Sequence, residues 1–268
     1  METIRTRVIT AVILALASVG IVLYLPRVVT IVGVTIAVLA GAWEWSAFLR
    51  TSRGSVRLGY VLLIAALLPA ACVITSNGFG QRLFFLCTLV WWLLAFVWIL
   101  TAPRRATPAV AAFAGIAALV PAWLALLRLR QLEDGAQWLL FVLVLVWAAD
   151  VGAFFVGRRF GKHKLAPAVS PGKTWEGVIG GVGAGGLVGW AGGVWFGLPL
   201  GNFLPLCLVV VCFSIVGDLT ESLLKRFAGI KDSGRLIPGH GGVMDRIDSV
   251  TGAAPTLLLG LATLGLAP

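Results

Sequence analysis

Charged residues are scarce in this chain. Asp, Glu, Lys and Arg make up only 12% of its 268 residues, whereas 59% are hydrophobic and the mean hydropathy is +1.00. A soluble domain of this length could not hide so much apolar surface. The composition therefore excludes a soluble globular protein and is typical of a polytopic membrane protein. Hydrophilic stretches are short, so we expect one transmembrane domain over residues 1–268.

Histidine and cysteine are also scarce, which argues against a zinc or disulfide centre. The two histidines, His163 and His240, lie far apart in the sequence, and no cysteine is near His240. Zinc sites need several such ligands at short spacings. The four cysteines lie within or beside apolar runs without a Cys-x-x-Cys pair, so we expect them to be small buried side chains.

Nine apolar runs are long enough to cross a membrane, for which a helix needs about 20 residues. These runs lie at about 8–25, 28–48, 58–75, 83–100, 109–127, 136–156, 175–196, 203–224 and 249–267. We predict an all-α fold of about nine transmembrane helices, divided into N-terminal helices (1–135) and a C-terminal half (136–268). The first run resembles a signal peptide, but it continues to Leu25, so we expect an uncleaved helix.

The cations are distributed unevenly between the two sides of the membrane. With nine spans, 17 of the 21 Lys and Arg residues fall on the side of the N-terminus. Because cytoplasmic loops carry an excess of cations, we expect the N-terminus and the two longest loops, 157–174 and 225–248, in the cytoplasm. The protein would be a multi-pass protein of the cell inner membrane. Its net charge of +10 would attract anionic membrane lipid and requires no nucleic-acid partner.

Charge is concentrated where the eighth run ends. Asp218, Glu221, Ser222 and Lys225 are spaced so that they share one face of a helix. A carboxylate inside an apolar helix costs about 2.5–3.5 kcal/mol unless it faces a polar cavity or a partner. The pattern predicts a polar site there. The alternative is an ion pair of Lys225 with either carboxylate that only closes the helix end.

A second pair of carboxylates, Asp245 and Asp248, follows a Gly-rich turn at 238–242. Together with Asp218 they offer the hard oxygen ligands that Mg²⁺ prefers. The glycines would let backbone amides approach an anion closely. The alternative is a flexible turn capped by an aspartate. His240 in this turn could contact a phosphate, donate a proton or only be a polar loop residue.

A further cluster lies around the sixth and seventh runs. Asp150 falls within an apolar run, which makes it a functional candidate. Residues 172–174 read Gly-Lys-Thr, as in a Walker A loop, but Pro167 stands where that loop needs glycine and no buried strand precedes it. A Ser/Lys/Thr loop that opens the next helix still suits a phosphate. The cations at 158–164 have an equally good explanation as a topology signal.

Together these motifs resemble the phosphatidate cytidylyltransferase (CDP-diacylglycerol synthase) family. The resemblance rests on the polar positions of residues 222–248, on Asp-x-Gly-Ala from Asp150, and on Ser-Pro-Gly-Lys-Thr-Trp-Glu-Gly at 170–177. It covers the C-terminal half closely and the first five runs only in hydropathy and length. Phe154 stands where many members carry tyrosine. The resemblance implies that CTP and phosphatidate react to give CDP-diacylglycerol and pyrophosphate, with Mg²⁺, at the cytoplasmic face.

The resemblance also implies roles for the residues, which we state as hypotheses. Metal ligands are Asp218, Asp245 and Asp248, with Glu221 a weaker candidate. Cations that hold the triphosphate or the phosphatidate head group are Lys225, Arg226 and Lys231. Ser170, Lys173 and Thr174 would bind CTP phosphates. The remaining substrate-binding candidates are Asp150, Ser222, Asp232 and His240. A second, monovalent cation is conceivable beside Mg²⁺, although no residue demands one.

The same residues are also compatible with other classes of membrane protein. Intramembrane carboxylates also occur in ion-coupled secondary transporters, which are the main alternative. The Asp-rich motif of CDP-alcohol phosphotransferases is missing. The Gly-rich seventh run predicts close helix packing, which offers a contact face for a homodimer. Glu44, between two tryptophans, could lie at the membrane interface or face the helix bundle, and the sequence does not decide.

Overall fold

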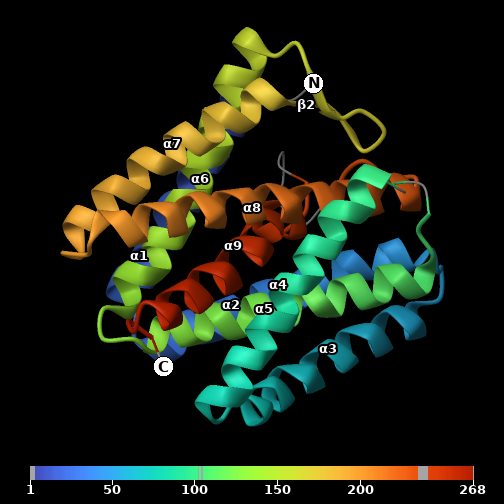
Figure 1. Cartoon of the computed structure of the whole chain (residues 1–268). Helices are drawn as coiled ribbons and strands as arrows, with labels where there is room; N and C mark the ends of the chain where they lie inside the picture. The colour runs from blue at the N-terminus through green and yellow to red at the C-terminus, as the bar shows by residue number, and fades with distance from the viewer. Residues whose placement is uncertain (1–3, 102, 104, 235–240, 268) are drawn as a thin grey trace.

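The computed structural model describes residues 4–101, 103, 105–234 and 241–267. For residues 4–12 and 14 it describes the backbone only. These residues form nine α-helices, one 3₁₀ helix and one hairpin (Figure 1). The elements are α1 (Ile4–Tyr24), α2 (Arg27–Trp45), η1 (Ser46–Leu49), α3 (Gly54–Ile74), α4 (Gly78–Thr101), α5 (Pro108–Gln131), α6 (Gly135–Phe160), β1 (Lys164–Ala166), β2 (Ser170–Thr174), α7 (Trp175–Trp195), α8 (Leu200–Ala228) and α9 (Met244–Thr263).

Seven of the described helices, α2 to α8, are long and apolar enough to cross a membrane. This confirms the prediction of an all-α, polytopic membrane protein, and it does not confirm the predicted number of nine spans. The first predicted span falls on α1, where the searched residues contain only a shorter apolar stretch, Ala15–Tyr24. The last falls on α9, which is more polar because Asp245, Arg246 and Asp248 occupy its beginning.

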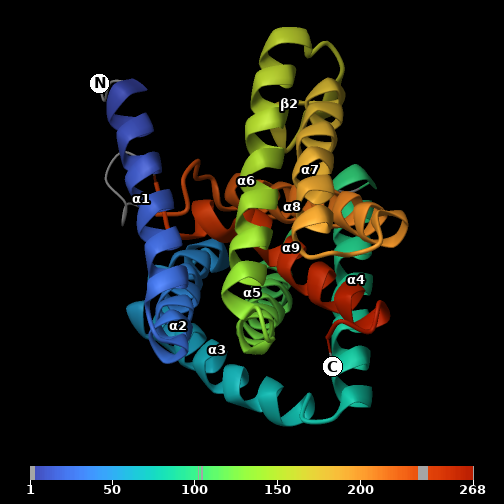
Figure 2. The ribbon, with the colours of Figure 1, turned by 90° about the vertical axis from the view of Figure 1, so that its left-hand side faces the viewer.

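The two predicted loops are shorter than expected because the helices continue into them. α6 runs to Phe160, and the rest of 157–174 is mostly the antiparallel hairpin, in which Lys164 pairs with Thr174 and Ala166 with Ser170. α8 runs to Ala228 and α9 starts at Met244, and the described residues between them, 229–234 and 241–243, are called here the joining segment. In both views the hairpin and the start of α1 lie toward one end of the molecule, and the end of α9 lies toward the other (Figures 1 and 2).

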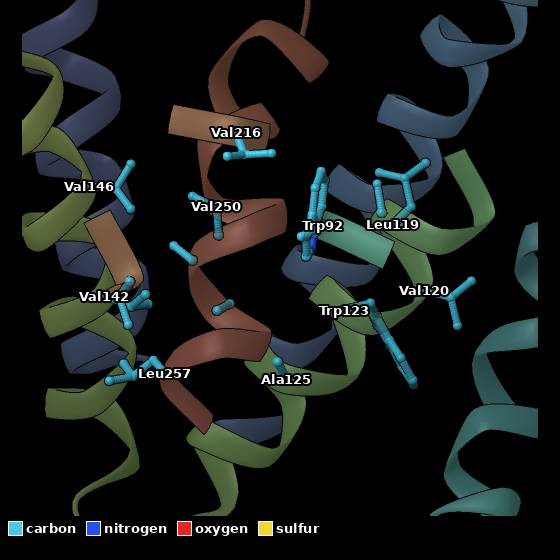
Figure 3. Close-up of a cluster of buried hydrophobic side chains, with 14 of the residues drawn as sticks. Trp92, Leu119, Val120, Trp123, Ala125, Val142, Val146, Val216, Val250 and Leu257 are labelled. Carbon is cyan, nitrogen blue, oxygen red and sulfur yellow. The ribbon is translucent and has the colours of Figure 1, made fainter. Parts of the chain in front are cut away.

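Helices α5 and α9 lie at the centre of the bundle (Figure 2). They contact each other, and fourteen of the twenty residues of α9 are buried. Figure 3 shows side chains of α4, α5, α6, α8 and α9 in one buried cluster, which includes Trp92, Leu119, Val142, Val216 and Val250. Large apolar side chains that remain exposed lie on the outer helices, as a lipid-facing surface requires. The N-terminal helices and the C-terminal half therefore share one core.

The Gly-rich helix α7 packs closely against α6 within the chain. A Cβ atom added at Gly180 would lie 2.4 Å from Cβ of Val156, and one added at Gly152 would lie 2.5 Å from the carbonyl oxygen of Gly180. Further along α7, an added Cβ at Gly189 would lie 2.7 Å from Cβ of Cys207 in α8. The glycines let these helix backbones approach, so the expected close packing occurs inside one chain.

We predict that Gly180→Val lowers the stability of the protein, because the added side chain meets Val156 and an overpacked contact costs about 1–3 kcal/mol. The measurement is the thermal midpoint of the purified protein in detergent. Gly183→Val is the matched control, since an added Cβ at Gly183 has no heavy atom within 4 Å. Equal midpoints for the two variants would contradict the packing argument.

Candidate functional site

Residues from the two polar sequence clusters meet beside the hairpin. A cavity of about 490 Å³, called here the hairpin cavity, lies between α6, β2, α7 and α8, and its lining includes Asp150, Arg158, Lys173 and Asp218. Lys173 forms an ion pair with Asp218, which is 45 residues away in the sequence. The structure therefore brings together the clusters that the sequence analysis treated separately.

The hairpin ends where α7 begins, and Thr174 makes this junction. Its hydroxyl oxygen accepts a hydrogen bond of 3.1 Å from the amide of Gly177, which is an N-cap of α7. Thr174 therefore has a structural role in addition to any contact with a ligand, and it lines the hairpin cavity. Ser170 begins β2 opposite Ala166 and is not among the residues that line this cavity.

On α8, Lys225 lies between two carboxylates. Its Nζ atom is 2.5 Å from Oε2 of Glu221 and 2.9 Å from Oδ1 of Asp245. Glu221 is fully buried, and neither of its oxygens has a hydrogen bond that meets normal geometry, despite the ion pair. Lys225 thus pairs with Glu221 of its own helix, as the alternative expected. It also pairs with Asp245 of α9, so it does more than close the end of α8. Ser222 donates a long hydrogen bond of 3.4 Å to Asp218.

Asp245, in the first turn of α9, organises the joining segment. Its carboxylate accepts hydrogen bonds from the amides of Gly242 (2.8 Å) and Ser233 (3.2 Å), in addition to Lys225. Gly241 adopts a positive φ of 80°, which favours glycine at this turn. The alternative of a turn capped by an aspartate therefore describes Asp245 well. Its oxygens already have protein donors, which limits their use for a ligand.

Asp248 lies where α8 crosses α9. The crossing is close because a Cβ added at Gly217 would lie 2.6 Å from the carbonyl oxygen of Asp248, and one added at Gly252 would lie 2.1 Å from that of Phe213. Asp218 follows Gly217 directly, so this contact brings Asp218 and Asp248 into electrostatic interaction. Asp248 also interacts with Glu221 and Asp150 in this way. Asp248 is 9% exposed, and its carboxylate accepts a hydrogen bond of 2.7 Å from the amide of Ser249.

Within the described residues, five carboxylates outnumber the cations that interact with them. They are Asp150, Asp218, Glu221, Asp245 and Asp248, called here the carboxylate cluster. Those cations are Lys173, Lys225 and Arg246. Carboxylates that outnumber their cations in an apolar surrounding suit a divalent cation. Within the described ranges, however, no three His, Cys, Asp or Glu side chains form a group that could hold a metal ion. The lysines hold Asp218 and Asp245 in ion pairs instead.

The remaining predicted residues are placed as follows. Arg226 donates from Nε to the carbonyl oxygen of Val169 at 3.2 Å, so it fastens α8 to the hairpin. Lys231 and Asp232 are exposed in the joining segment, where Asp232 lies beside Gly241. His240 lies outside the described residues.

Sequence reasoning did not assign a role to two charged residues near the site. The first is Arg246 of α9. Together with Asp150 it lines a second cavity of about 680 Å³, called here the bundle cavity, between α1, α2, α5, α6 and α9. Its other lining residues are almost all apolar, such as Val34, Leu143 and Val250. The second residue is Glu44 of α2, which is buried and bonded to the joining segment. For Glu44, the sequence signal was a lone carboxylate within an apolar run.

The structure therefore defines a multi-pass helical membrane protein in which a carboxylate cluster lies beside two cavities. The family model described as "Cytidylyltransferase family" matches residues 5–264, and the chain belongs to this family. Similar proteins include the phosphatidate cytidylyltransferase of Pseudomonas aeruginosa, which is 41% identical over 265 residues, or 94% of each chain. That of Haemophilus influenzae is 38% identical (94% of this chain, 96% of the relative), and that of Brucella suis is 36% identical (97% and 93%).

We predict that Lys225→Met strongly destabilises the protein, because it leaves the buried Glu221 and the half-buried Asp245 without their shared cation. Removing one partner of a buried ion pair costs about 3–5 kcal/mol. Adding Glu221→Gln should restore part of this loss. The measurement is thermal unfolding in detergent. Lys173→Met is the control, since its pair with Asp218 is about a quarter exposed and should contribute less than about 1 kcal/mol. A similar loss in both lysine variants would contradict the assignment.

Proposed function

We propose that this chain transfers the cytidylyl group of CTP to phosphatidate, which gives CDP-diacylglycerol and pyrophosphate. The observation that carries this proposal is that the hairpin cavity and the bundle cavity share Asp150. One cavity offers Lys173, Arg158 and the start of α7 to phosphates, and the other offers an apolar space to acyl chains. A nucleotide and a lipid could therefore meet beside the carboxylate cluster, as the names of the relatives imply.

The reaction depends more on neutralising the negative charge of the phosphates than on a general base. A phosphate oxygen of phosphatidate, already an anion near neutral pH, forms a bond to the α-phosphorus of CTP, and pyrophosphate leaves with the electron pair of the broken bond. The barrier comes from the approach of polyanions and the charge of the leaving group. Lys173 and Lys225, with Arg226 and Lys231, are the residues we assign to the phosphates. Arg246 is added as a contact for the lipid phosphate because it lines the bundle cavity.

A divalent cation fits the charge of the carboxylate cluster. Asp218, Asp245 and Asp248 remain our proposed ligands for Mg²⁺, with Glu221 the weaker candidate, and a second, monovalent cation remains a proposal without assigned residues. Mg²⁺, when bound, would neutralise phosphate charge and stabilise the leaving group. Lys173 holds Asp218 in an ion pair. Phosphates that bind Lys173 would compete for it and release Asp218 to a cation.

The orientation in the membrane belongs to the same proposal. We propose nine spans with the N-terminus in the cytoplasm of a cell with an inner membrane, so that the hairpin and the joining segment face CTP and anionic lipid. The distribution of Lys and Arg supports this topology. A homodimer is compatible with it. The secondary-transporter alternative is not supported, since the matched relatives are named as cytidylyltransferases.

We expect purified protein in mixed detergent–phosphatidate micelles to move label from CTP into lipid and to release pyrophosphate in equal amount. Chelation of Mg²⁺ should abolish transfer, and ATP should not replace CTP. Asp218→Asn should lower turnover at least about 100-fold, since the change removes a charge from the carboxylate cluster. Folded wild-type protein that transfers no label with Mg²⁺ would overturn the proposal. Near-normal turnover of Asp218→Asn at every Mg²⁺ concentration would overturn the metal assignment alone.

We also expect Ala37→Trp to raise the KM for phosphatidate about tenfold and to leave the KM for CTP unchanged. Ala37 lies on α2 and lines the bundle cavity, so the indole would fill space that acyl chains need. Ala66→Trp, on the exposed face of α3, is the matched control and should change neither constant. A higher KM for CTP with an unchanged KM for phosphatidate would show that the two cavities have been assigned the wrong way round.

A further inference from the structure

Glu44 connects the N-terminal helices to the joining segment. It lies in α2 and is only 2% exposed. Its Oε2 atom accepts hydrogen bonds from the amide of Met244 (2.8 Å) and the hydroxyl of Ser233 (3.2 Å), which are 200 and 189 residues away in the sequence. A single buried carboxylate thus binds Ser233 of the joining segment and Met244, the first residue of α9.

Two glycines make room for this carboxylate. A Cβ atom added at Gly234 would lie 2.0 Å from Oε1 of Glu44, and one added at Gly242 would lie 2.3 Å from Oε2. Neither glycine has a positive φ, in contrast to Gly241. Their lack of a side chain is therefore explained by space for Glu44 and not by backbone conformation.

Glu44 and Asp245 hold the joining segment from two sides. Ser233 donates its hydroxyl to Glu44 and its amide to Asp245. Close by, the amide of Gly242 binds Asp245 and the amide of Met244 binds Glu44. Val243, the N-cap residue of α9, provides no side-chain hydrogen bond of its own. Glu44 therefore caps α9 from another helix, immediately before Asp245.

The end of α2 that carries Glu44 is itself fixed. Arg57 donates from Nη2 to the carbonyl oxygen of Trp43 (2.9 Å) and from Nε to the hydroxyl of Ser46 (2.8 Å). Its guanidinium lies 4.4 Å from the centre of a Trp43 ring. The indole of Trp45 donates to the carbonyl oxygen of Ala111 at 2.8 Å. Side chains held in this way can transmit a defined position to their hydrogen-bond partners.

We propose that Glu44 is a positioning residue for the cytidylyl transfer. It sets the start of α9, and thereby the place of Asp245 and of Lys225, without itself touching a substrate. This inference rests on the proposed function. Supporting residues behind a metal or phosphate site contribute about 10–100-fold to affinity or activity when they are removed.

The test compares Glu44→Ala, Glu44→Gln and Thr35→Val with the wild type. Thr35→Val is the matched control, because Thr35 lies on the same helix and accepts a half-buried hydrogen bond from Trp123 of α5 at 2.8 Å. We measure kcat, the KM for CTP, the Mg²⁺ concentration for half-maximal activity and the thermal midpoint. Glu44→Ala should lower kcat/KM about 10–100-fold and raise the Mg²⁺ requirement, whereas Glu44→Gln should stay within about threefold of wild type because its amide oxygen still accepts both bonds.

A second variant keeps the inference testable if Glu44→Ala does not fold. Ser233→Ala removes one of the two bonds, and it should change the same constants in the same direction by about 3–10-fold. Unchanged constants in Ser233→Ala and in any folded Glu44→Ala would overturn the proposal. So would a loss of activity in Thr35→Val equal to that in Glu44→Ala at the same thermal midpoint, since this would assign Glu44 a role in stability only.

Hydrogen–deuterium exchange separates this inference from the proposed function. Glu44→Ala should exchange faster than wild type in peptides that cover Ala228, Ser233 and Met244, and Thr35→Val should not. If wild-type protein transfers no cytidylyl group but this exchange pattern is found, the proposed reaction is wrong, whereas the positioning of the joining segment by Glu44 is confirmed. If the wild type transfers the group but Glu44→Ala exchanges at the wild-type rate, the positioning role of Glu44 is wrong and the proposed reaction is retained.

Discussion

Negative charge buried among apolar helices must be balanced, and this requirement organises the centre of the molecule. The carboxylate cluster gathers residues from α6, α8 and α9, and each lysine that balances it joins two elements. Lys173 connects β2 to α8, and Lys225 connects α8 to α9. An uncompensated charge at the fully buried Glu221 costs several kcal/mol, so the pairs of Lys225 fix α8 against α9. The more exposed pair of Lys173 with Asp218 contributes less. Electrostatics therefore helps to determine the packing here.

Close packing in turn makes this charge arrangement attainable. Gly217 and Gly252 let α8 and α9 cross with their backbones in near contact, which brings Asp218 and Asp248 together. Glycines at the α6–α7 contact do the same for the helix that follows the hairpin, so Lys173 reaches α8. A larger residue at any of these crossings would separate charges that balance one another. The small residues of the sequence and its buried charges are two parts of one arrangement.

Much of this could be predicted from the sequence, for physical reasons that also explain the rest. Long apolar runs identify helices because only helices satisfy the backbone in lipid. Spacing along α8 and at the start of α9 placed Asp218 with Glu221 and Asp245 with Asp248 on common faces. Spacing cannot, however, reveal contacts between distant elements, so the pair of Lys173 with Asp218 and the bond of Glu44 to Met244 appear only in the structure. The hairpin was missed because its strands have three and five residues.

Dividing the chain at residue 136 separates the sequence motifs from the earlier helices. It does not separate the elements that build the site. The motifs lie in the second part, yet α2 caps α9 through Glu44, and α1, α2 and α5 supply about half of the residues that line the bundle cavity. A buried acceptor and an apolar wall need only one suitable residue at each position, so they leave no pattern of charge or glycine along the chain. The earlier helices are therefore part of the site's construction, even though their sequence shows only hydropathy.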